Sequence, residues 1–88
     1  MRSDYQGALT WYQKSLELSE KILGKEHLVV ATIHNNIALV YGRQKDYQKA
    51  LEQYQKSLEI NEKILGEDHP EAVSVYNNIA LIHDRQGE

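Results

Sequence analysis

The 88-residue chain contains no cysteine. This absence excludes disulfides, thiolate zinc sites and a cysteine nucleophile, and it is unusual in a small secreted protein, so a cytoplasmic location is expected. The chain also lacks a run of about 20 apolar residues and a leader-like N-terminus, so neither a membrane span nor a secretion signal is expected. Its 10 basic and 13 acidic residues give a net charge of −3, and because the two signs are interspersed, neither nucleic acid nor a membrane surface is an expected partner. The sequence predicts a soluble protein held together by packing.

Motifs for catalysis, metal binding and cofactor binding are also missing from the sequence. The glycines stand singly, so no phosphate-binding loop is expected. No two of the four histidines have the i,i+4 spacing of a zinc site on a helix. Instead, His27 and His69 are expected to cap helix starts, while His34 and His83 stand at positions suited to aromatic side chains. We therefore expect no enzyme, no metal and no cofactor.

What the sequence does contain is an internal repeat. Shifting the chain by about 42 residues places residues 4–45 on residues 46–87, with roughly 24 identical positions. The longest matching blocks are Tyr12–Glu17 on Tyr54–Glu59 and Asn35–Leu39 on Asn77–Leu81. A period of this length is typical of a solenoid, in which each unit buries its apolar face against its neighbours.

Apolar residues recur in steps of three and four, which predicts four amphipathic helices and an all-α fold. The expected helices span residues 4–24, 29–44, 46–66 and 70–86. Almost no linker separates the second helix from the third, so these two should form a tight antiparallel hairpin. The stripes expected to be buried on the second and fourth helices are Val30, Ile33, Ile37, Ala38, Val40 and Tyr41, and Val73, Tyr76, Ile79, Ala80, Ile82 and His83.

Residues suited to helix ends stand at the expected boundaries. Asp4 and Asp46 can serve as N-caps, because their carboxylates accept hydrogen bonds from unpaired backbone N–H groups. Gly24 and Gly66 can adopt the left-handed conformation that ends a helix. Pro70, the one proline in the chain, suits a first helical turn.

The residues on either side of the predicted hairpin follow the pattern of a known family. A large and a small apolar residue and an aromatic residue on one helix precede a small, aromatic, small series on the next. The pattern comprises Ile37, Ala38, Tyr41, Asp46, Tyr47, Ala50, Tyr54 and Ser57, and parts of it recur at Asp4, Tyr5, Ala8, Tyr12 and Ser15 and at Ile79 and Ala80. It resembles the tetratricopeptide repeat (TPR), and the long period is similar to the subclass found in kinesin light chains and microbial TPR arrays. The resemblance implies antiparallel helical hairpins of an α-solenoid, in the order helix B, helix A, helix B, helix A.

This order leaves one complete repeat flanked by two half repeats. Terminal repeats normally carry a polar outer face, and neither end of this sequence shows that adaptation. We interpret the chain as a segment of a longer array, or as an element that associates through its ends. Trp11 is expected to fill the open N-terminal face or to contact a partner. The candidate self-association residues are Leu9, Trp11, Tyr12, Leu16, Ile79, Ile82 and His83.

In the TPR family, the A helices line a groove that binds peptide segments of partner proteins. The positions carried over by resemblance are Asn35, Asn36, Leu39, Arg43, Asn77, Asn78, Leu81 and Arg85. Asparagine amides both donate and accept, so they can pair with an extended backbone, and arginine can fork onto a carboxylate, which favours acidic peptides. Alternatively, Asn36 and Asn78 join neighbouring helices, and the arginines balance helix dipoles. The sequence thus favours a non-catalytic scaffold for a protein or peptide partner, with a self-assembling homo-oligomer, including a helix-exchanged dimer, as the alternative.

Overall fold

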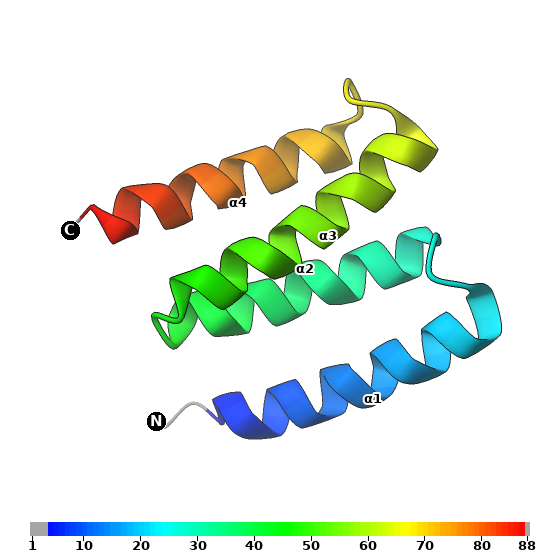
Figure 1. Cartoon of the computed structure of the whole chain (residues 1–88), viewed down its shortest axis with the longest axis horizontal. Coiled ribbons are helices and arrows are strands. Elements are labelled where there is room, and N and C mark those ends of the chain that lie inside the picture. The colour runs from blue at the N-terminus through cyan, green and yellow to red at the C-terminus, as the bar shows by residue number, and fades with distance from the viewer. Residues whose placement is uncertain (1–3, 88) are drawn as a thin grey trace.

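The computed structural model describes residues 4–87, and four α-helices account for most of them. They are α1 (Tyr5–Leu23), α2 (Leu28–Arg43), α3 (Tyr47–Leu65) and α4 (Pro70–Gln86). Each helix runs antiparallel to the one before it, and the four lie in chain order across a slab (Figure 1). No strand occurs within residues 4–87. The predicted all-α solenoid with helices in the order B, A, B, A is confirmed. The predicted segment also included residues 1–3 and 88, which lie outside the described part.

Packing follows the order of the chain. α2 packs against α1 on one side and most extensively against α3 on the other, and α4 packs against α3. The molecule measures 34 × 29 × 20 Å along its principal axes. Because α1 packs mainly on α2 and α4 mainly on α3, the outer sides of the first and last helices are not covered. Each of these two helices keeps a face that no other described helix touches.

The N-termini of the two B helices differ, although both begin after an aspartate. Asp4 accepts a hydrogen bond from the backbone N–H of Gly7 at 2.8 Å, as predicted for an N-cap. Asp46 makes no such bond and instead lies 3.7 Å from the Lys49 ammonium. A Cβ atom on Gly7 would stand 2.1 Å from the Asp4 carboxylate. α3 carries a lysine at this position, so its aspartate cannot adopt the same close geometry.

The A helices begin at histidines, as predicted. The Nδ1 atom of His27 accepts from the Val29 backbone N–H at 3.1 Å. His69 accepts from Glu71 in the same way at 3.2 Å. The turn histidines of the two repeats therefore have a structural role, which satisfies one orphan donor of each helix.

The B helices end at glycines with positive φ. Gly24 has φ 89° and ψ 162°, and Gly66 has φ 90° and ψ 162°. The expected left-handed helical conformation has a much smaller ψ, so this expectation is corrected: the backbone is extended at positive φ, a region open essentially to glycine alone. Each glycine N–H still closes its helix, by donating to the carbonyl oxygens of Glu20 and Glu62 at 2.9 and 3.0 Å.

Lys45 forms the tight turn between α2 and α3. Its φ of 67° is the one positive value outside glycine in the described chain. The Asp46 N–H donates to the Tyr41 carbonyl at 2.9 Å, and the Lys45 N–H donates to the Gly42 carbonyl at 3.1 Å. These two bonds define a Schellman motif, whose left-handed position is usually glycine. One period later, the sequence has Gly87 at this position.

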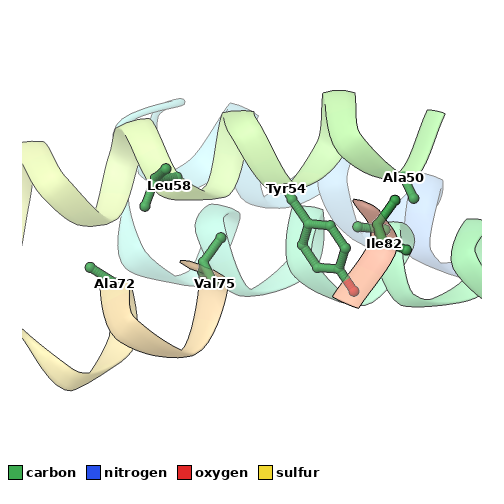
Figure 2. Close-up of a cluster of buried hydrophobic side chains, with 7 residues drawn as sticks. Ala50, Tyr54, Leu58, Ala72, Val75 and Ile82 are labelled. Atoms are coloured by element: carbon green, nitrogen blue, oxygen red, sulfur yellow. The ribbon is translucent and has the colours of Figure 1, made fainter. Parts of the chain in front are cut away.

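Three apolar clusters form the core. Figure 2 shows most of the largest cluster, which joins α2, α3 and α4 and consists of Ala38, Ala50, Tyr54, Leu58, Ala72, Val75 and Ile82. A second cluster joins α1 to α2 and consists of Leu9, Ile33, Ile37 and Val40. A third consists of Val30, Ala31 and Ile60. Each cluster draws on neighbouring helices, as expected of a solenoid.

The buried stripe predicted for α2 is largely correct, but the one predicted for α4 is partly wrong. Val73 is 47% exposed and Tyr76 is 40% exposed, and Ala80 and His83 are also exposed. The corresponding residues of α2 include Ala31 and His34, which are 1% and 6% exposed because α3 covers them. No described helix covers α4 on that side, so the same positions remain open to solvent.

Candidate functional site

The two A helices run in the same direction (Figure 1), and α2 and α4 contact each other at two places. The close approach depends on Gly42, since a Cβ atom there would meet the Ile82 side chain at 3.2 Å. A second link is a hydrogen bond from the Asn78 amide to the Asn35 side-chain oxygen at 3.3 Å. These two contacts hold α2 and α4 at a fixed spacing, and we treat the surface between them as the candidate peptide groove.

Each A helix contributes one row of side chains to this groove. The helical spacing of three and four residues places the members of a row on one face. We call the two series the α2 row and the α4 row. The α2 row consists of Thr32, Asn36, Leu39 and Arg43, and the α4 row consists of Ser74, Asn78, Leu81 and Arg85. Leu39 is 37% exposed and Leu81 is 47% exposed, so each row offers an apolar contact between an amide and a guanidinium group.

Polar side chains from α3 lie beneath the groove. Ser57 and Asn61 are 1% and 6% exposed, and the Asn61 amide donates to the Ser57 hydroxyl at 3.4 Å. Together with Thr32 and Asn35 of α2 and Ser74 of α4, they line a small cavity of about 70 Å³. Asn61 was not among the site residues predicted from the sequence. Its position inside a helix could have indicated a polar role, because asparagine in a helix interior is unfavourable by roughly 0.5 kcal/mol relative to alanine.

The four asparagines predicted to bind peptide have different surroundings. Asn35 and Asn78 are half-buried and bond to each other. Asn36 is half-buried and Asn77 is exposed, and within residues 4–87 neither amide forms a bond between helices. The alternative expectation named Asn36 and Asn78 as links between neighbouring helices: Asn78 forms such a link, to Asn35, and Asn36 does not. One amide pair therefore sets the helix spacing.

Arg43 and Arg85 lie in the last turns of their helices and are exposed. Neither forms an ion pair within the described residues. Both act on the same phenol: burial raises the pKa of Tyr54, and the positive charges of Arg85 and Arg43 oppose that rise. Each arginine occupies the same position in the last turn of its A helix.

The residues predicted for self-association do not all lie on the outer surface. Leu9 and Ile82 are 7% and 3% exposed and belong to core clusters within the chain. Tyr12, Leu16 and Ile79 are half-buried against those clusters. Trp11 is 75% exposed, so it does not fill the N-terminal face as expected. His83 is exposed as well.

A larger hollow lies between α1, α3 and the C-terminal end of α2. It has a volume of about 710 Å³, and its lining includes Lys14, Glu17, Asp46 and Lys49. The lining carries two positive and two negative charges, and Lys49 lies 5.6 Å from the ring centre of Tyr41. The α1 part of this lining recurs one period later on α3, where Gln48, Leu51, Glu52, Gln55, Lys56 and Glu59 line a second hollow. We favour the α2 and α4 rows instead, because they carry the asparagine, leucine and arginine positions that the TPR resemblance assigns to peptide binding. Residues 4–87 contain no cluster of three or more potential metal ligands and no helix long and apolar enough to cross a membrane.

Helical hairpins stacked in chain order, with a groove along alternate helices, define an α-solenoid. The family model of the tetratricopeptide repeat matches residues 1–63 and 29–88, and the chain belongs to this family. The crystal structure of BtubC (BKLC) from P. vanneervenii matches with a TM-score of 0.87 and 28% identity. The match covers 93% of this chain and 32% of that chain, so the chain spans about a third of the length of BtubC. No curated protein sequence matches the chain significantly.

Proposed function

We propose that the chain is a non-catalytic scaffold that binds an extended segment of a partner protein between the α2 row and the α4 row. The observation that carries the proposal is the identical asparagine, leucine and arginine series of the α2 row and the α4 row, on two A helices that the bond between Asn78 and Asn35 joins. TPR proteins are generally non-catalytic interaction modules. The pattern supplies the three kinds of contact that an extended peptide requires.

The amides suit a peptide backbone. Asn36 presents both a donor and an acceptor, so it can pair with a backbone amide whatever the peptide sequence. Leu39 and Leu81 are exposed, and in the proposed complex they would bury one apolar side chain of the peptide between them. Affinity would then come from apolar contact, and register from the amides.

The arginines suit an acidic group. Arg43 and Arg85 have no carboxylate partner within the described residues, and their guanidinium groups can bind a carboxylate through two hydrogen bonds. We propose that an acidic side chain or the C-terminal carboxylate of the partner lies at this end of the groove. A purely electrostatic role at the helix ends would require positive charge but not the planar fork.

Substitution by lysine separates these two roles. The double variant Arg43→Lys and Arg85→Lys keeps both charges and removes the bidentate geometry. In a library of acidic peptides, we expect affinity to fall about tenfold or more, because a hydrogen bond to a charged group contributes about 1.5–3 kcal/mol. Lys56→Ala, on the exposed surface of α3, is the control and should bind as the original chain does.

A broader variant tests the groove as a whole. Substituting Asn36, Asn78 and Arg43 together by alanine should abolish binding of the selected peptides. The Asn36→Ala single variant leaves the bond between Asn35 and Asn78 intact, so it separates peptide contact from helix spacing. Unchanged affinity of every selected peptide for the triple variant would rule out the groove as the binding site.

A further inference from the structure

The outer side of α1 carries an exposed apolar stripe. Trp11 and Ile22 are each 75% exposed, and Leu18 is 46% exposed. Together with Ser15, their spacing of four, three and four residues places them on one helix face. We call this stripe the α1 face. The opposite end of the molecule also exposes apolar groups, and we call Val73, Tyr76 and Ala80 on α4 the α4 face.

The repeat identifies the structural counterpart of each face. Residues of the α1 face correspond to Gln53, Ser57, Ile60 and Ile64 on α3. Ser57 and Ile60 are 1% and 9% exposed, because α3 packs on α2 along this side. Residues of the α4 face correspond to Ala31, His34 and Ala38 on α2, which are 1%, 6% and 0% exposed. The two exposed faces are thus the two halves of an interface that the chain already forms internally.

We propose that the α4 face of one copy of this chain receives the α1 face of a second copy, in the geometry in which α2 receives α3. The occupant is a second copy because the surface that α4 requires is the surface that α1 presents. Apart from the Asn36 amide, this contact uses residues outside the α2 row and the α4 row, and it does not depend on peptide binding. The proposal is supported by a comparison of three contacts of the α2–α3 interface with the residues at the corresponding positions of the new junction. In each case the two corresponding residues can also form a favourable contact.

The central contact changes from polar to aromatic. Within the chain, His34 Nδ1 lies 2.7 Å from the Gln53 side-chain oxygen. At the junction, the corresponding residues are Tyr76 of one copy and Trp11 of the other. Two exposed aromatic rings then take the place of a hydrogen-bonded pair. Both polar residues of that pair are aromatic at the corresponding positions of the new junction. Buried tryptophan and tyrosine are the commonest anchors of protein interfaces.

The flanking contacts keep their chemistry. Lys63 lies 3.0 Å from Glu26 across the α2–α3 interface, and the corresponding pair is Lys21 of one copy with Asp68 of the other. The charges are therefore complementary at the same place. On the apolar side, Ile60 belongs to a cluster with Ala31. Leu18 on Val73 is the corresponding contact.

The junction also places two asparagines where the chain has an asparagine pair. The bond between Asn35 and Asn78 joins successive A helices, and the corresponding pair at the junction is Asn77 of one copy with Asn36 of the other. Such a contact is heterologous, since two different faces meet, and it leaves one free face at each end of the pair. Association should therefore proceed beyond the dimer as concentration rises. The A helices of successive copies would line one continuous groove.

Two single substitutions separate this arrangement from a symmetric dimer. Trp11→Glu places a charge on the α1 face, and Val73→Glu places one on the α4 face. Both residues are exposed, so the fold should be retained, which the helical circular dichroism spectrum checks. Each variant alone should remain monomeric from about 1 μM to about 1 mM in sedimentation velocity, a range that covers weak interfaces. An equimolar mixture retains one intact face of each kind and should form a 1:1 dimer and nothing larger.

The single tryptophan of the chain gives an independent signal. In the mixture, Trp11 is present only in the Val73→Glu copy, and its fluorescence should shift to shorter wavelength as the ring is buried. The original chain should show the same shift with increasing concentration. A dimer of Val73→Glu alone would indicate contact between two α1 faces and overturn the proposal. A mixture that stays monomeric, or an original chain that is monomeric throughout this range, would also overturn it. The Arg43→Lys and Arg85→Lys variant should associate normally, so failure of one proposal leaves the other open.

Discussion

Replacing Lys45 by glycine should stabilise the chain. Lys45 holds the left-handed position of the Schellman motif with φ 67°, and a side chain in this region is unfavourable by roughly 1–2 kcal/mol. Glycine removes that strain but loses more conformational entropy on folding, about 0.5–1 kcal/mol. The difference predicts a net stabilisation of about 0.5–1 kcal/mol. In a domain of this size, that corresponds to an increase in Tm of several degrees.

Urea denaturation followed by circular dichroism measures the effect. The Val73→Glu background keeps self-association out of the measurement, because association raises apparent stability. Lys45→Ala is one control: it removes the charge and retains the strain, so its free energy of unfolding should change little. Gln44→Gly is the other control. Gln44 has φ −76°, where glycine relieves no strain, so this variant should be destabilised.

A result in which Lys45→Gly and Gln44→Gly are equally destabilised would refute the assigned role of the turn. The same variant bears on helix exchange between copies. Exchange would straighten the turn and release the strain at Lys45, so removing the strain weakens one driving force for it. We expect the Lys45→Gly variant to show no increase in exchanged dimer by size-exclusion chromatography.

Two further changes follow from local geometry. Gly66→Ala should lower the free energy of unfolding by about 1–3 kcal/mol, because alanine is strained in this backbone region. No atom lies within 4 Å of the added Cβ, so a steric clash would not contribute to the effect. An unchanged Tm in thermal denaturation would contradict the assigned conformation. The Tyr76 hydroxyl donates to the Glu62 carboxylate, and this bond raises the pKa of Tyr76 to about 12. Since the folded pKa exceeds the ordinary value of 10.0, the stabilisation should be full below pH 10 and fall as the pH rises towards 12. Tyr76→Phe should remove that part of the alkaline dependence, and an unchanged profile would exclude the bond.

The sequence was sufficient to predict the four helices and their stacking. The 42-residue period indicates the stacked repeats, and the spacing of apolar residues indicates the helices. Both signals lie within the sequence of each repeat and do not depend on tertiary contacts. The histidine caps were also predictable, since His27 and His69 occupy the same turn position. The difference between Asp4 and Asp46 was harder to predict, because it depends on the residue three positions later, and only the structure shows that Gly7 makes room for the carboxylate.

Burial at the ends was the main failure of sequence reasoning. The repeat shows that Val73 and Tyr76 belong to a face suited to packing, but it cannot show whether a neighbour is present. The opposite error occurred at Leu9 and Ile82, which were assigned to end surfaces and are core residues. In a solenoid, burial is decided by the adjacent unit, so terminal positions cannot be inferred from the internal ones.

The groove residues were predicted by position, but their pairing was not. Helix periodicity places Asn36 and Asn78 at equivalent positions, and both were candidates for a link between neighbouring helices. The observed link joins Asn78 to Asn35, which are not equivalent positions of the repeat. The burial that raises the pKa of Tyr54, and the opposing charges of Arg85 and Arg43, likewise depend on tertiary packing, which spacing within one helix does not specify.

The most direct test of peptide binding is a nuclear magnetic resonance titration of the ¹⁵N-labelled Val73→Glu variant with an acidic peptide selected from the library. Side-chain signals of Asn36, Arg43 and Arg85 should shift together and saturate at one peptide per chain, while the Trp11 indole signal on α1 should not move. In the Arg43→Lys and Arg85→Lys variant, about ten times more peptide should be needed for the same shift of the Asn36 signal, because the variant loses bidentate hydrogen bonds to the carboxylate. Shifts confined to α1 and the outer side of α3, with the groove signals unchanged, would contradict the proposed function.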